Sequence, residues 1–149
     1  MPYRYGLGEA PIEQQAPPDA QQSLYQQSLA EGGPSEEPGC YVFKRSLAGN
    51  DKAPNLRQPI DGDSDFVLTA IYGRSTGTFT LNITDRAGKP IYSAEADSRN
   101  VMGTAQFPVP IRPALWFPAG GQIGISVTET SGVANDLEIV FQGIKRFKT

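Results

Sequence analysis

The feature that most limits what this chain can fold into is a two-residue alternation of apolar and polar side chains that begins near Cys40. It is clearest in residues 76–85, where Phe79, Leu81 and Ile83 alternate with threonine and asparagine. A period of two places successive side chains on opposite faces of a β-strand. No stretch of residues 40–149 has the helical period, so this region is predicted to be all-β.

Seven or eight strands are expected in residues 40–149, separated by turns rich in glycine, proline, asparagine and aspartate. They are predicted at 40–45, 65–73, 76–85, 89–94, 104–109, 112–117, 122–128 and 136–147. Residues 47–59 are predicted as a loop and residues 85–88 as a tight turn. In residues 65–73 both faces are partly apolar.

Strands at this spacing favour an antiparallel β-sandwich or a closed barrel. Four prolines between residues 108 and 118 suit edges and corners, because proline cannot donate to a sheet ladder. The cysteine–tryptophan–cysteine pattern of immunoglobulin domains is missing. We therefore expect a jelly-roll-like antiparallel sandwich.

Residues 1–39 have a different composition. They contain one basic and six acidic residues, six of the 13 prolines and many glutamines. Such a segment buries too little apolar surface to offset the entropy of ordering it. We expect an extended N-terminal arm over 1–39 and a β-sandwich domain over 40–149. The arm is expected to hold at most one short helix, beginning at Asp19 and ending before Gly32, with a disordered linker as the alternative.

The arm offers few large apolar groups to a partner. We predict that five of them anchor it to neighbouring subunits: Tyr3, Tyr5, Leu24, Tyr25 and Leu29.

Several kinds of chemistry lack their residues. The chain has no histidine and one cysteine, Cys40, which excludes Ser-His-Asp and Cys-His sites, zinc hydrolysis and a disulfide scaffold. Cys40 is predicted to be a small packed residue. A net charge of −3 argues against nucleic-acid and anionic-membrane partners. We see no signal peptide and no apolar run of ~18 residues, and we expect no enzyme activity, cofactor or metal.

Three charged motifs are candidates for function. Residues 61–65 resemble the start of a calcium loop, but Phe66 and Tyr72 stand where an EF-hand needs glycine and glutamate. We interpret them as a solvated turn, with a weak cation site as the alternative. Glu95 and Asp97 are interpreted as surface charges rather than a glycosidase pair. The basic pairs at 44–45 and 145–146 are interpreted as a solvated rim or a contact with an acidic partner.

Four segments carry a family resemblance: residues 65–68, 83–89, 117–123 and 134–147. The last, with its alternating apolar residues followed by Gly143, Lys145 and Phe147, is the most specific. They resemble small accessory structural proteins of tailed-bacteriophage virions, the β-sandwich decoration (cement) proteins and the neck or collar proteins.

The resemblance implies a protein that acts by binding, assembled in the host cytoplasm and located in the virion. Its expected partners are the major capsid protein, neck or portal-ring proteins, and further copies of itself. The arm, which the resemblance does not cover, is predicted to clasp neighbouring subunits. The alternative is a carbohydrate-binding sandwich for host recognition, with Tyr72, Tyr92 or Trp116 as platforms. A hydrolase is the weakest of the three interpretations.

Overall fold

The computed structural model describes residues 35–147, which form eight strands and one short helix. The elements are β1 (Ser35–Leu47), β2 (Lys52–Pro59), β3 (Ser64–Ser75), β4 (Phe79–Thr84), β5 (Ala96–Asp97), α3 (Ser98–Val101), β6 (Val109–Phe117), β7 (Gln122–Glu129) and β8 (Asn135–Phe147).

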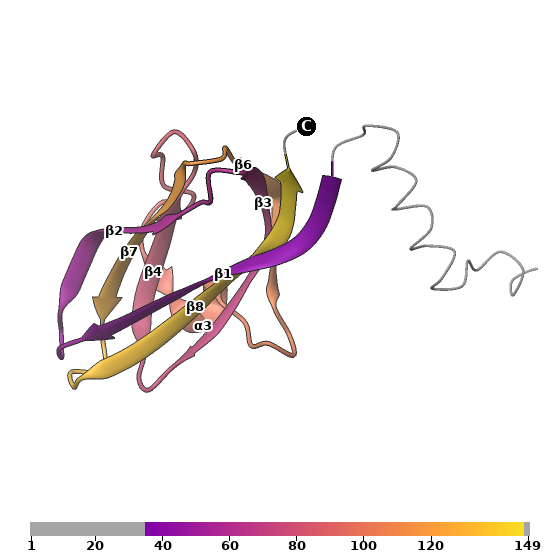
Figure 1. Cartoon of the computed structure of the whole chain (residues 1–149). Helices are drawn as coiled ribbons and strands as arrows, with labels where there is room; N and C mark the ends of the chain where they lie inside the picture. Colours follow the sequence, from indigo (N-terminus) through magenta and orange to yellow (C-terminus); the bar gives the residue numbers. More distant parts are fainter. Residues whose placement is uncertain (1–34, 148–149) are drawn as a thin grey trace, which may run out of the picture. The chain divides into compact units, whose positions relative to one another are not determined.

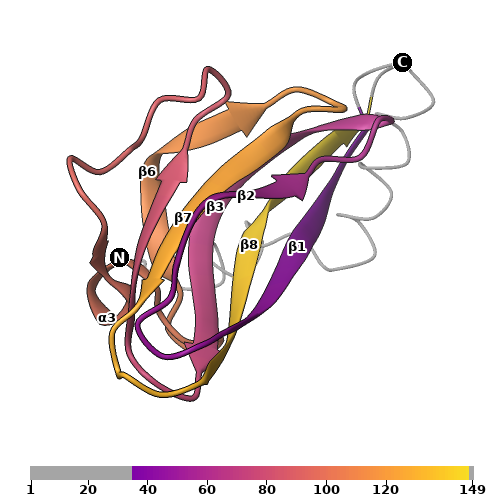
Figure 2. The same cartoon turned by 90° about the vertical axis from the view of Figure 1, so that its left-hand side faces the viewer.

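The strands form two four-stranded antiparallel sheets, ordered β1-β8-β3-β6 and β2-β7-β4-β5 (Figure 1). Four of the neighbouring pairs are β1 with β8, β2 with β7, β3 with β6 and β4 with β5. These are the pairs that one long antiparallel hairpin would form, and in this fold the hairpin is wrapped around the core. Figure 2 shows β8 running between β1 and β3. This is the strand order of a jelly roll, and the predicted all-β sandwich is confirmed.

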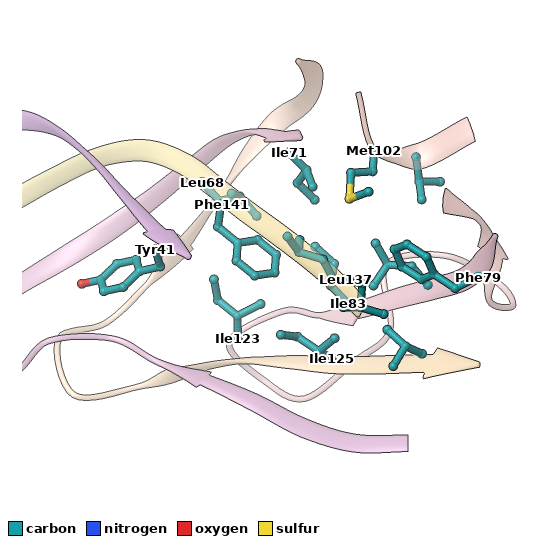
Figure 3. Close-up of a cluster of buried hydrophobic side chains, with 14 of the residues drawn as sticks. Tyr41, Leu68, Ile71, Phe79, Ile83, Met102, Ile123, Ile125, Leu137 and Phe141 are labelled. Atoms are coloured by element: carbon teal, nitrogen blue, oxygen red, sulfur yellow. The ribbon is translucent and has the colours of Figure 1, made fainter. Parts of the chain in front are cut away.

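The core lies between the two sheets and comes from the alternation in the sequence. Phe79, Leu81 and Ile83 of β4 point inward and are 0% exposed, as predicted. Figure 3 shows Phe79 and Ile83 in one buried cluster with residues of the opposite sheet such as Leu68 and Phe141. Burying one such side chain contributes about 1.5–3 kcal/mol, so the inward faces of both sheets stabilise the sandwich.

Glu129, at the end of β7, is a buried carboxylate that joins two turns. It is 1% exposed and accepts hydrogen bonds from the backbone N–H groups of Asn50, Ser131 and Gly132 and from Nδ2 of Asn135. Burial acts to raise the pKa of Glu129, but these hydrogen bonds and one from the Ser131 hydroxyl outweigh it and lower the pKa to about 2. The ionised carboxylate therefore ties the turn after β1 to the turn after β7.

The predicted boundaries need correction on the N-terminal side. β1 begins at Ser35 rather than at Cys40, because its neighbour β8 continues to Phe147 and so lies beside residues 35–39, where Glu36 also forms an ion pair with Arg146. Residues 47–59 were predicted as a loop, but residues 52–59 form β2. This strand lies at a sheet edge, with Pro54 at an irregularity in its pairing with β7. An edge strand tolerates proline, which is why the loop prediction was wrong.

The strand predicted at 89–94 does not form. Its backbone is held instead by the side chain of Asn82, which accepts from the Tyr92 N–H (3.2 Å) and donates to the Tyr92 carbonyl (3.1 Å). The strand beside β4 is β5, at Ala96–Asp97, followed by the short helix α3, which was not predicted. The two strands predicted within 104–117 are one strand, β6.

Candidate binding surface

The outer face of the β1-β8-β3-β6 sheet carries an unusual share of exposed apolar side chains. Of five large apolar residues that stay exposed within 35–147, three lie there: Val42 on β1, Ile144 on β8 and Trp116 on β6. The register places Val67 of β3 opposite both Ile144 and Trp116. An apolar row therefore crosses three strands on this face.

A second apolar row crosses β1, β8 and β3 nearer the other end. Side-chain contacts between β1 and β8 follow one antiparallel register, from Glu36–Arg146 to Lys44–Glu138 and Ser46–Asp136. That register places Val42 opposite Val140, and Tyr72 of β3 pairs with Val140 from the other side.

Charged residues border both rows. At one end, Nη2 of Arg146 lies 2.7 Å from Oε2 of Glu36, and Asp65 is opposite Arg146 on β3. At the other end, Nζ of Lys44 lies 3.8 Å from Oε1 of Glu138, with Arg74 opposite on β3. In each row the sign alternates from strand to strand, which favours the pairing of these strands.

Trp116 is fixed at the edge of this face. Its Nε1 donates to Oδ2 of Asp65 at 3.1 Å, and the guanidinium of Arg86 lies 4.9 Å from the centre of its ring. The other Asp65 oxygen accepts from the Ala119 N–H at 2.9 Å. The indole is thus oriented by a hydrogen bond and a cation–π contact while 39% of the residue stays exposed.

The outer face of the opposite sheet is polar by contrast. Glu95 lies over it and accepts hydrogen bonds from the hydroxyls of Thr80, Ser126 and Thr128. Partial burial acts to raise the pKa of Glu95, but these hydroxyls outweigh it and lower the pKa. The carboxylate is saturated by donors from β4 and β7, which suits a structural role.

The charged motifs singled out in the sequence are dispersed among separate partners. Asp61 forms an ion pair with Lys145 (3.0 Å), while Asp65 binds Trp116. The hydrogen bond that Lys145 donates to Asp61 raises the pKa of Lys145. Asp97 caps α3 and forms an ion pair with Arg99, whereas Glu95 accepts hydrogen bonds from hydroxyl groups of β4 and β7. The two carboxylates therefore do not form a pair. Within 35–147 no three potential metal-binding side chains come together.

The structure describes only some of the predicted binding residues. The arm anchors Tyr3, Tyr5, Leu24, Tyr25 and Leu29 lie outside the described residues.

Of the aromatic candidates for sugar binding, Tyr72 and Trp116 share the outer face of one sheet, whereas Tyr92 packs against the core. Cys40 was predicted to be packed, and this is wrong: its side chain is exposed, because even-numbered residues of β1 face outward.

Sequence reasoning missed Val42 and Ile144 as exposed residues, and missed that Val140 lies beside Val42 on the same face. The apolar character of both faces of residues 65–73 was the available signal, since one face fills the core and leaves the other for a partner. Neither the known protein families nor the curated proteins compared with this chain gave a match. In the part of the chain described, no helix has the length and apolar character needed to cross a membrane.

Proposed function

We propose that this chain is a non-enzymatic structural protein of a tailed-phage virion, which decorates or cements the capsid or forms part of the neck or collar. Its partners would be the major capsid protein, neck or portal-ring proteins, and copies of itself. The resemblance of the closing segment, residues 134–147, supports the virion assignment. The fold is compatible with it, since jelly rolls are common in viral capsid proteins.

The observation that carries a binding role is the outer face of the β1-β8-β3-β6 sheet. Val42, Tyr72, Val67, Ile144 and Trp116 form apolar rows there, bordered by charged rows. Exposed apolar patches with a polar border mark interaction sites. The opposite sheet, saturated by the Glu95 network, offers no comparable apolar face among the described residues.

Sedimentation of the full-length protein with purified phage heads and tails tests the proposal. Binding to heads at high copy number indicates a decoration protein, and binding only to particles that retain the neck indicates a collar protein. Ile144→Lys should weaken binding by about tenfold or more, as expected for the loss of a central apolar contact. Phe107→Lys, at a 73% exposed position in the loop before β6, is the matched control. If the wild-type protein binds neither particle, the proposal is refuted.

A carbohydrate-binding module is the second candidate, favoured by the common face of Tyr72 and Trp116. Against it, Arg86 already covers the Trp116 ring and Asp65 holds its N–H. Titration of tryptophan fluorescence with host polysaccharides distinguishes the two functions. A saturable change that Trp116→Ala or Tyr72→Ala weakens would favour sugar binding.

A further inference from the structure

The four sheet edges of this sandwich are protected unequally. β2 contains Pro54 and Pro59, β6 contains Pro110 and Pro113, and β5 is two residues long. Proline and short length both prevent an edge strand from pairing with another chain. These three edges are therefore poor templates for a further strand.

β1 is the exception. It is 13 residues long, lies at the edge of its sheet, and within 35–147 no strand pairs with its second edge. Pro38 is its only proline, so residues 39–47 keep all their backbone donors. A long edge strand with free N–H and C=O groups is a site for strand addition. The question is which strand the edge accepts.

We propose that β1 pairs with β1 of a second copy, antiparallel and around a two-fold axis at Cys40, to join two sandwiches through one continuous eight-stranded sheet. Outward residues must then lie opposite outward residues, so even-numbered positions of β1 face even-numbered positions. With Cys40 opposite Cys40 of the second copy, Glu36 lies opposite Lys44 and Pro38 opposite Val42. An interface of this symmetry uses the same patch on both copies.

Charge complementarity supports this register. The charged row at one end of the first copy meets the charged row at the other end of the second, so that the sign alternates across six strands. From the first copy into the second, the row reads Asp65, Arg146, Glu36, then Lys44, Glu138, Arg74. Opposite charges on neighbouring strands stabilise a sheet, and like charges destabilise it.

The apolar rows join in the same register. Ile144 and Pro38 of one copy continue into Val42 and Val140 of the other, so that the exposed side chains of Pro38 and Val42 meet at the junction. A shift of two residues in either direction places Glu36 opposite Val42 or Ser46 and breaks both rows. Only the register centred on Cys40 matches charge with charge and apolar with apolar.

The segment before β1 supports a second copy as the occupant. Residues 1–34 contain one basic and four acidic residues. In the proposed pair, Ser35 of each copy lies opposite Arg45 of the other, beside Lys44. The basic pair of the second copy thus adjoins the start of β1, and the acidic composition of residues 1–34 complements its charge.

The test uses the purified full-length protein without any phage particle, so its result is independent of the virion proposal. Directly opposite residues of antiparallel strands have Cα atoms ~4.5–5.5 Å apart, within the range of a disulfide. Oxidation by diamide, which takes two electrons and two protons from a thiol pair, should link Cys40 to Cys40 of the second copy. Paired thiols act at an effective concentration on the order of millimolar, so at about 10 μM protein we expect linking roughly tenfold or more faster than between free copies.

The double variant Cys40→Ser, Val42→Cys is the matched control, because position 42 is on the same strand and face and is exposed. In the proposed register, residues 42 of the two copies are offset by four positions, about 13 Å along the strand. That distance is too great for a disulfide. Linking at position 42 as fast as at position 40 would overturn the register.

Sedimentation equilibrium tests the pair itself. The wild-type protein should be a dimer, and Cys40→Lys, which sets two positive charges against each other at the axis, should be a folded monomer whose melting temperature no longer depends on protein concentration. Phe107→Lys should remain a dimer. A monomeric wild-type protein at about 100 μM, or a dimeric Cys40→Lys, would refute pairing through β1.

Discussion

Gly143, near the end of β8, offers a quantitative test of how closely the central strands of the β1-β8-β3-β6 sheet approach each other. A Cβ at this position would collide with the carbonyl oxygen of Val67 on β3 and lie 3.0 Å from Cζ of Phe66. The carbonyl belongs to the backbone of the paired strand, so Gly143→Ala must move β3 and β8 apart locally. The phenyl ring of Phe66 is 0% exposed and has little room to yield.

The expected cost follows from two effects. Overpacking of a close-packed core costs about 1–3 kcal/mol, and a weakened ladder hydrogen bond adds about 0.5–1.5 kcal/mol. We therefore expect Gly143→Ala to lower the free energy of unfolding by about 2–4 kcal/mol. For a domain of this size that is a fall in melting temperature of roughly 8–16 °C.

Urea unfolding followed by the fluorescence of Trp116, the single tryptophan, measures the effect. Gly62→Ala is the control, since a Cβ at Gly62 meets nothing within 4 Å and should change stability by less than about 0.5 kcal/mol. If Gly143→Ala unfolds at the same urea concentration as Gly62→Ala, the close approach of β3 and β8 is wrong.

Three further predictions follow from the contacts described. Glu129→Gln should lower the urea midpoint at pH 7. Because the pKa of Glu129 in the folded protein is lowered from 4.5 to about 2, the difference in midpoint between wild type and variant should shrink as the pH falls below 4.5 and vanish near pH 2. A difference independent of pH would contradict the role of the ionised carboxylate. Deleting residues 1–39 removes the Glu36–Arg146 pair and the start of β1 and should lower the melting temperature more than deleting residues 1–34; equal effects would place the boundary elsewhere. Arg86→Ala uncovers the Trp116 ring and should increase its quenching by acrylamide, with a loss of stability of no more than about 1 kcal/mol. The control Arg45→Ala should change neither the quenching nor the stability.

The inward face of the sandwich was readable from the sequence because alternation reports burial directly. Phe79, Leu81 and Ile83 show this most clearly. The tight turn at 85–88 was also readable, since the Asp85 side chain accepts from the Ala87 and Lys89 N–H groups and Gly88 has a φ of 80°.

The errors arose where long-range contacts override local pattern. β2 looks like a loop because of its prolines and polar residues, and only its place at a sheet edge allows it to be a strand. Residues 89–94 look like a strand, but the side chain of Asn82 takes the backbone bonds of Tyr92 that a neighbouring strand would need.

The candidate surface could not be predicted from the sequence either, because it also depends on long-range contacts. Val42, Tyr72 and Val140 are separated by tens of residues and become neighbours only through the order of the strands. A one-dimensional pattern reports which face each residue occupies, whereas the composition of a surface depends on which strands adjoin.

The nesting of the strands determines when the chain can fold during synthesis. β8 lies between β1 and β3, and β7 lies between β2 and β4. A ribosome-bound chain that ends before residue 122 therefore lacks the strand that joins β1 to β3 and the strand that joins β2 to β4. Neither sheet can form completely until residues 122–147 have left the ribosome. At about 5–20 residues per second, β1 spends several seconds without its partner, and a chaperone that covers apolar strands would act on this protein in that interval.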